Sequence, residues 1–123
     1  MKSIFSVFLL LVCCSTFAFN DEDCNGESGT TRSQACVATQ TGRVLDRKLN
    51  VKYKKIVATY KEQGLDKELR LLTAAQRAWI VYRDKLCEFE NQAIGGSNSV
   101  SWSHCIARLT ETRLNELNEI QGD

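Results

Sequence analysis

The chain of 123 residues contains no proline, a single histidine and almost no net charge. Because all-β folds depend on tight turns in which proline is frequent, its absence argues against an all-β protein and leaves long helices uninterrupted. Sixteen Lys and Arg against fifteen Asp and Glu give a formal charge of +1, which excludes a general basic surface for nucleic acid. The length and the ordinary share of apolar residues predict one globular domain.

Long apolar runs are also missing, apart from one at the N-terminus. The segment from Ile4 to Cys14 follows a short basic start and precedes small residues that end at Ala18, which is the layout of a secretory signal peptide. Its 11 residues are too few to span a membrane, which needs about 20. We therefore expect a signal peptide over 1–18, a single domain over 19–123, and a periplasmic or secreted protein.

A lipid anchor at Cys14 is the alternative. The segment Leu11–Cys14 is similar to a lipoprotein box, in which the cysteine becomes the lipidated first residue. Such boxes carry Gly, Ala or Ser before that cysteine, whereas this chain has Cys13. We therefore favour ordinary cleavage.

Four cysteines follow the signal segment: Cys24, Cys36, Cys87 and Cys105. An even number in an exported chain predicts two disulfides, with three possible pairings. The spacings of 11 and 17 intervening residues differ from the close pairs of zinc sites, so we expect no metal. Gly95-Gly96 lies midway between the last two cysteines, and two helices that fold back there would bring them together. This symmetry favours Cys87–Cys105 and Cys24–Cys36.

Over residues 44–60 the apolar residues recur at the spacing of one face of a helix. Gly64 is a residue type that commonly ends a helix, so we expect this helix to end there. Thr31 and Gln34 fit a capping box, so the helix begins either near residue 32 or after the weak helix formers that precede residue 43. Arginine and lysine crowd its other faces. We interpret them as a solvated surface that acidic residues near the C-terminus neutralise, with an anionic partner as the alternative.

Two further helices follow. Asp66 is a predicted N-cap for a helix that ends near Ile94, and Ser101 or Ser103 is the predicted cap of a helix that ends near residue 120. We find no convincing strand. The sequence predicts an all-α fold, a small antiparallel bundle of about three helices with two disulfides.

Polar residues interrupt the apolar stripes of the second and third helices. Because an unpaired buried charge is very costly, we expect a structural polar network of Gln76, Arg83, Asp84 and Arg113. The alternative is a ligand-binding role for these arginines. Trp79 and Trp102 are expected in the core or at its edge.

Catalytic patterns are weak. His104 is the sole histidine, and its neighbour Cys105 is assigned to a disulfide, so a nucleophile with an activating base is not indicated. Glu88 and Glu90 point to different sides of a helix. Gly95-Gly96 lacks the lysine of a phosphate-binding loop. We predict no enzyme and no cofactor.

The stretch Leu72–Cys87 (LTAAQRAWIVYRDKLC), followed by Gly95-Gly96-Ser97, Cys105 and Leu109-Thr110-x-x-Arg113, resembles the LprI-type lysozyme-inhibitor family. An upstream segment over 45–53 is similar as well, so the resemblance covers about residues 24–117. It implies a small helical, disulfide-bonded protein of the bacterial envelope that inhibits lysozyme. The motif residues define either the fold or the inhibition.

We therefore expect a non-enzymatic binding protein with a protein partner, a lysozyme in the leading interpretation. The predicted binding loop runs from Gly95 to His104, and its candidate residues are Gly95, Gly96, Ser97, Asn98 and His104. A loop tethered by a disulfide is pre-organised for binding. An ordinary helix–helix turn is the alternative for this segment. The rival function is an envelope structural or immunity protein that does not contact lysozyme.

Overall fold

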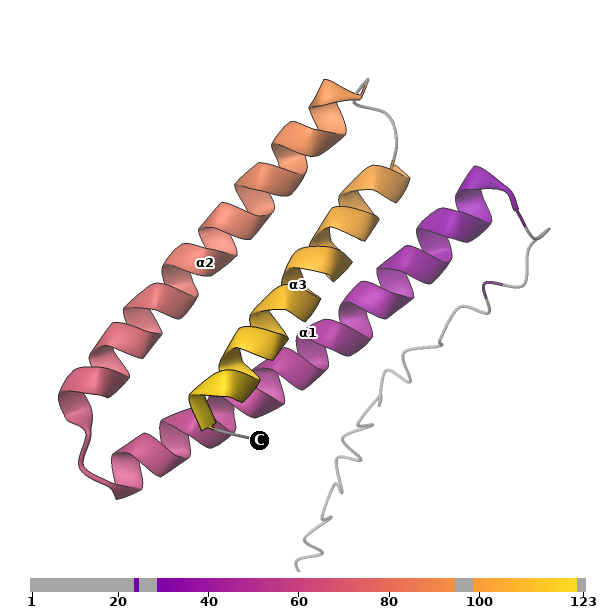
Figure 1. Cartoon of the computed structure of the whole chain (residues 1–123). Coiled ribbons are helices and arrows are strands. Elements are labelled where there is room, and N and C mark those ends of the chain that lie inside the picture. The colour runs from indigo at the N-terminus through magenta and orange to yellow at the C-terminus, as the bar shows by residue number, and fades with distance from the viewer. Residues whose placement is uncertain (1–23, 25–28, 95–98, 122–123) are drawn as a thin grey trace, which may run out of the picture.

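The structure, a computed structural model, describes residues 24, 29–94 and 99–121. It contains three helices, α1 (Thr31–Glu62), α2 (Asp66–Ala93) and α3 (Ser99–Gln121), and no strand among the described residues (Figure 1). The all-α prediction is confirmed. The predicted signal segment and lipidation site lie outside the described residues. None of the three helices is long and apolar enough to cross a membrane.

Helix α1 is continuous from Thr31, which decides between the two predicted starts. Its N-cap is Thr30, whose hydroxyl accepts a hydrogen bond from the Ser33 amide at 3.1 Å. The predicted capping box on Thr31 is therefore wrong by one residue. The Gln34 side chain donates instead to the carbonyl of Gly29 at 3.4 Å.

A glycine stop ends α1, as predicted. Gly64 has φ +69°, a left-handed conformation that only glycine adopts without strain. The Leu65 amide donates to the Tyr60 carbonyl at 2.9 Å and the Gly64 amide to the Lys61 carbonyl at 3.1 Å, which is a Schellman motif. Leu65, and not the predicted Asp66, is the N-cap of α2, and it makes no side-chain capping bond.

Helix α3 begins at Ser99, earlier than the sequence suggested. Ser101 and Ser103 lie inside the helix, so neither is its cap. The Ser103 side chain is buried and shares a hydrogen bond of 2.9 Å with the Thr39 hydroxyl. That bond ties the first turns of α3 to the beginning of α1.

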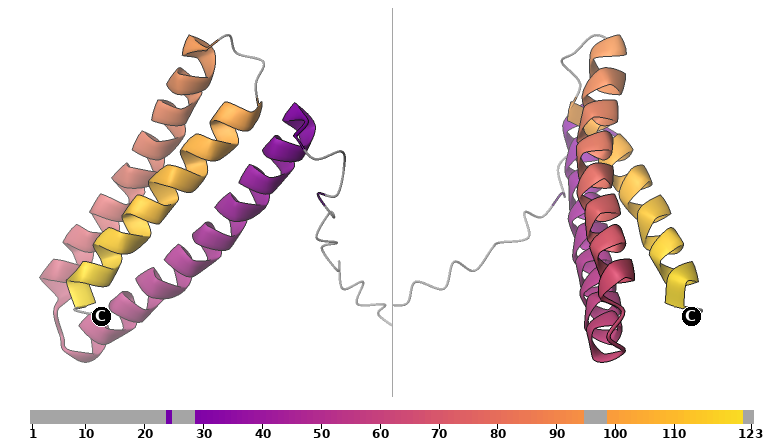
Figure 2. Two further views of the ribbon diagram at one scale, coloured as in Figure 1. Left: turned by 45° about the vertical axis from the view of Figure 1, so that its right-hand side comes forward. Right: turned by 90° about the vertical axis from the view of Figure 1, so that its left-hand side faces the viewer.

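The helices run alternately down, up and down, so α1 and α3 point the same way and α2 opposes both (Figure 1). In two further views α3 lies across the space between α1 and α2 and tilts out of their plane toward its C-terminus (Figure 2). The contact of α3 with α1 is the most extensive and that of α1 with α2 the least. The predicted bundle therefore depends mainly on helices that are not consecutive in sequence.

Two apolar clusters hold these contacts. The first contains the buried side chains of Leu49, Ile56 and Leu117, and the second those of Cys87, Cys105 and Leu109. Trp79 packs against both clusters and so connects them. Ile56, Cys87 and Leu117 are fully buried.

The predicted disulfide pairing is confirmed. Cys24 is bonded to Cys36 with Cα atoms 5.7 Å apart, and Cys87 to Cys105 with Cα atoms 5.5 Å apart. The first bond ties the chain ahead of α1 to that helix, and the second joins α2 to α3. Both bonds lie toward the end of the bundle at which α1 and α3 begin. This end also carries the site described next.

Candidate functional site

Arg83 of α2 lies between all three helices. Its side chain is only 14% exposed. The guanidinium donates to Asp84 at 2.9 Å, to Asp46 of α1 at 3.3 Å and to the buried Thr110 hydroxyl of α3 at 3.5 Å. These bonds satisfy a charge that would otherwise be very costly to bury.

Arg113 of α3 lies near Arg83 and is 13% exposed. It donates to the Gln76 side-chain oxygen at 3.0 Å and forms an ion pair with Glu116 at 2.7 Å. The two guanidinium carbons lie 5.1 Å (Arg83) and 6.0 Å (Arg113) from the centroid of the Trp79 ring, within reach of cation–π attraction. The four residues of the predicted polar network thus form two hydrogen-bonded pairs that share one indole.

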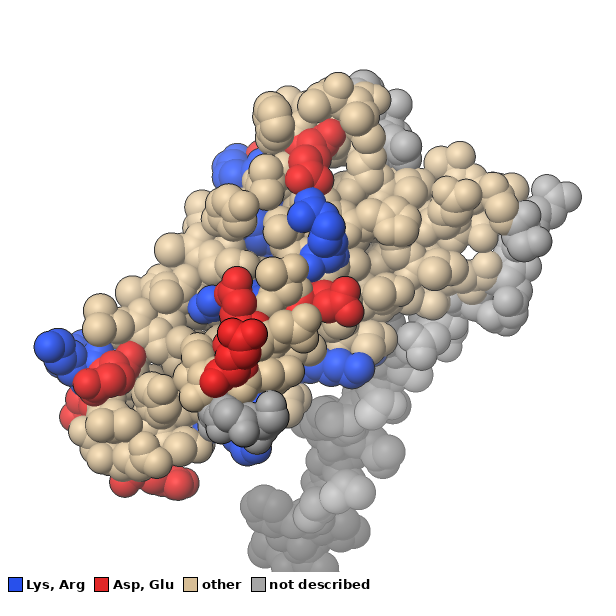
Figure 3. All heavy atoms as spheres, in the orientation of Figure 1, with Lys and Arg blue, Asp and Glu red and all other residues tan. Residues whose placement is uncertain are grey.

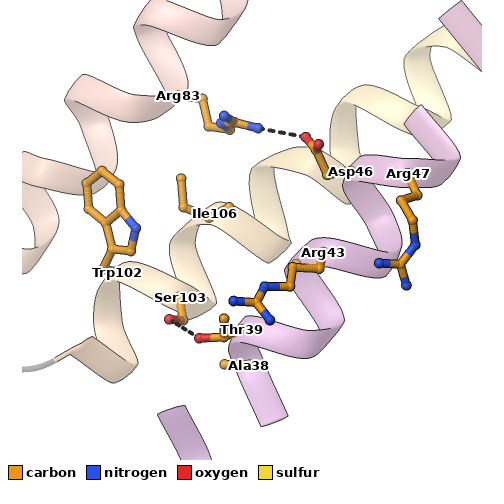
Figure 4. A pocket seen from close by; sticks show the side chains of 10 residues that line it. Ala38, Thr39, Arg43, Asp46, Arg47, Arg83, Trp102, Ser103 and Ile106 are labelled. Carbon is orange, nitrogen blue, oxygen red and sulfur yellow. Dashed lines mark hydrogen bonds and ion pairs between the residues drawn. The ribbon is translucent and has the colours of Figure 1, made fainter. Parts of the chain in front are cut away.

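A groove opens beside this network, between the first halves of α1 and α3 (Figure 4). Its volume is about 480 Å³, and the lining residues are Ala38, Thr39, Gly42, Arg43, Asp46, Arg47, Arg83, Trp102, Ser103 and Ile106. Gly42 is buried, and a Cβ atom added to it would lie 3.7 Å from the Ile106 side chain. The floor is therefore mostly small and apolar.

The charged residues of the groove come from two helices. Arg43 and Arg47 are exposed and one helical turn apart on α1, and Arg43 extends toward Ser103 and Ile106 (Figure 4). Asp46 is held by Arg83 in the ion pair already described. Trp102, 36% exposed, forms part of the wall contributed by α3. We name Arg43, Arg47, Arg83 and Trp102, with their apolar floor, the cationic groove.

A second hollow of about 510 Å³ lies on the other side of α3, against the end of α2. Phe89, Ile94, His104 and Arg108 are among its lining residues. The Nη2 atom of Arg108 donates to both carboxylate oxygens of Glu90, at 2.8 and 3.0 Å. The two hollows flank the first turns of α3, so this end of the bundle is indented on both sides of that helix.

The chemistry available here is recognition of anionic and aromatic groups. Guanidinium groups pair with carboxylates in bidentate geometry, and tryptophan supplies a large rigid contact. Cys105 is consumed by its disulfide, and His104 is exposed on α3. Among the described residues no group of His, Cys, Asp and Glu side chains is placed to hold a metal ion.

The second part of the predicted binding loop, residues 99–104, is helical. His104 lies within α3, because that helix begins at Ser99. Gly95, Gly96, Ser97 and Asn98 lie outside the described residues. No functional site was predicted at Arg43, Arg47 or Trp102. The available signal was the spacing of the two arginines, four residues apart within a basic helix.

The sequence model of the family described as Lysozyme inhibitor LprI matches residues 21–117. The chain belongs to the LprI lysozyme-inhibitor family. An uncharacterized protein of Rhizobium meliloti (strain 1021) is 35% identical over 136 aligned residues, covering 98% of this chain and 96% of that protein. No solved structure matches the chain.

LprI is a family of inhibitors rather than of enzymes. Membership, together with the two disulfides, indicates a protein that works outside the cytoplasm. The matched segment covers α1, α2, α3 as far as residue 117, and both arginines of the polar network.

Proposed function

We propose that this LprI protein is a non-enzymatic, periplasmic or secreted inhibitor that binds a lysozyme through its cationic groove. The groove is the observation that carries the proposal. Lysozymes cleave glycosidic bonds with a pair of carboxyl groups beside the substrate cleft. The exposed guanidinium groups of Arg43 and Arg47 suit such a partner, because arginine matches carboxylate geometry.

Trp102 supports the same surface. Tryptophan and arginine are the residue types that contribute most at protein interfaces, and they act best where neighbouring contacts exclude water. Trp102 stands in one wall of the groove, across from the α1 arginines, so a chain segment that enters would contact both (Figure 4). The Cys87–Cys105 bond and the Thr39–Ser103 hydrogen bond fix the turn of α3 that carries it.

Surface charge favours a local contact over long-range attraction. The chain has a formal charge of only +1, and side chains of both signs lie close together on the face shown in Figure 3. A balanced surface gives little electrostatic steering. The affinity would therefore come from the groove and its immediate rim.

The experiment is a titration of several lysozymes with the oxidised protein purified from the periplasm of an expression host. Replacing Arg43 and Arg47 together by alanine is expected to weaken inhibition about 30-fold, as the loss of about 2 kcal/mol of interface energy implies. The matched control replaces Lys48 and Lys54, two exposed cations of α1 outside the groove, and should leave inhibition within about twofold. Trp102→Ala should weaken inhibition at least tenfold.

Three results would contradict the proposal in different ways. If no lysozyme is inhibited, the rival function, an envelope structural or immunity protein, replaces it. If both double variants lose inhibition equally, charge and not the groove is responsible. If substitutions of Ser97, Asn98 and His104 weaken inhibition and those in the groove do not, the predicted loop is the binding surface. Melting curves followed by circular dichroism confirm that each variant is folded.

A further inference from the structure

Helix α2 carries a second apolar face that points away from the bundle. Its members recur at intervals of three and four residues and are exposed: Leu71, Ala74, Ala75, Ala78, Val81, Tyr82 and Phe89. We call this set the outer stripe. Its four largest side chains are 64% (Leu71), 63% (Val81), 56% (Tyr82) and 67% (Phe89) exposed. No other described helix lies in front of α2 in the right-hand view of Figure 2.

The outer stripe is distinct from the face that builds the core. Gln76 and Cys87, the buried residues of α2, lie on the side that meets α3. At 100° per residue the outer stripe is centred about half a turn away from them. Large apolar side chains exposed in a continuous row indicate an interaction surface, because single-domain proteins seldom leave such a row in water.

The order of side-chain sizes along the outer stripe is self-complementary. Ala74, Ala75 and Ala78 make its first half narrow, and Val81 and Tyr82 make its second half wide. In an antiparallel pair of α2 helices related by a two-fold axis near residues 79 and 80, heptad geometry places Val81 against Ala78 of the second copy and Tyr82 against Ala75. Val81 and Tyr82 then each meet an alanine, twice by symmetry.

Charges beside the outer stripe favour the same register. Arg70 and Arg77 flank its first half, and Asp84 flanks the second half with its carboxylate 47% exposed. The antiparallel register brings Arg77 of one copy to Asp84 of the other, whereas a parallel pair would place Arg77 beside Tyr82 of the second copy, because the flanking positions of parallel helices meet with a different offset. The attraction between Arg77 and Asp84 is therefore available only in the antiparallel orientation.

Lys85 interrupts the outer stripe between Tyr82 and Phe89. Its ammonium donates to the Glu88 carboxylate at 2.8 Å. This bond and the attraction between the charges raise the pKa of Lys85. Lys85 therefore stays ionised at neutral pH, and the antiparallel register places it against Ala74, where its long stem covers a small side chain.

We propose that a second copy of this chain docks on the outer stripe, α2 against α2 and antiparallel, to form a two-fold symmetric dimer. The stripe from Leu71 to Phe89 is about 27 Å long at 1.5 Å per residue. One helix pair of that length buries less than the roughly 800 Å² per partner of a standard interface. The dimer is therefore weak and reversible, with a dissociation constant on the order of 100 µM.

Sedimentation equilibrium of the oxidised protein tests this at concentrations up to about 500 µM, at which such an interface is more than half dimeric. Val81→Glu should weaken association at least tenfold. The matched control is Val51→Glu, because Val51 is a similarly exposed valine (69%) on α1, and it should dimerise as the unmodified protein does. Both substitutions are at exposed positions, so both proteins should melt as the unmodified one does.

Arg77→Glu tests the orientation. The antiparallel register would place its carboxylate against Asp84 of the second copy and weaken association several-fold, while Lys54→Glu on α1 should have no effect. Unchanged or tighter association of Arg77→Glu would overturn the register. A monomer at every concentration, or equal effects of the two valine variants, would overturn the dimer. Loss of lysozyme inhibition by Val81→Glu in a monomeric protein would show that the outer stripe binds lysozyme instead.

Discussion

Replacing Arg83 by methionine tests whether the polar network around Trp79 holds the three helices together. Methionine keeps an unbranched apolar stem but removes the guanidinium. The carboxylates of Asp84 and Asp46 are 47% and 48% exposed, so water replaces the lost partner and each ion pair contributes about 0.5 kcal/mol. The cation–π contact with Trp79 adds about 1 kcal/mol. We expect Arg83→Met to lower the free energy of unfolding by about 2 kcal/mol.

Urea unfolding of the oxidised protein at low micromolar concentration, followed by far-UV circular dichroism, measures this change. Arg83→Lys keeps a cation near the indole but loses the bidentate geometry, and should cost about 1 kcal/mol. Arg70→Met, on the exposed side of the same helix, should change stability by less than about 0.5 kcal/mol. An Arg83→Met protein as stable as the control, but unable to inhibit lysozyme, would refute the structural role and assign Arg83 to binding.

Three further predictions concern separate parts of the chain. Gly42→Ala should raise the free energy of unfolding by about 0.5–1 kcal/mol in the same urea assay, because its Cβ meets only ordinary contacts and alanine favours the helix. Glu88→Gln should lower the pKa of Lys85 toward its usual value in an NMR titration, since the carboxylate raises it. The exported protein should begin at Phe19 by intact-mass analysis, and a diacylglycerol on Cys14 would contradict that expectation.

Local signals were enough for the elements and their covalent links. Helical periodicity and Gly64 located α1 and its end, and the position of Gly95-Gly96 led to the correct pairing of four cysteines. The starts of the helices were less certain, since several neighbouring Ser, Thr and Asp residues can cap. Thr30 caps α1 in place of the predicted Thr31, and α3 begins at Ser99, ahead of the predicted Ser101 and Ser103.

The groove could not be predicted for a related reason. It depends on contact between α1 and α3, which are not consecutive, and on the approach of Gly42 to Ile106. Arg43 and Arg47 look like any solvated basic face until α3 lies beside them. The polar network was easier to foresee, because a charge at a buried helical position must find partners wherever the helices pack.

The position of the two disulfides has a consequence for when this protein becomes competent to bind. The groove lies near the apolar cluster of Cys87, Cys105 and Leu109, and the two cysteines are its most buried side chains. Their disulfide therefore takes the place of a larger apolar core at this end of the bundle. A newly made chain in the reducing cytoplasm lacks those bonds. The end of the bundle that carries the cationic groove would then reach its final structure only in an oxidising compartment. Mild reductant should abolish inhibition before it lowers the helix content.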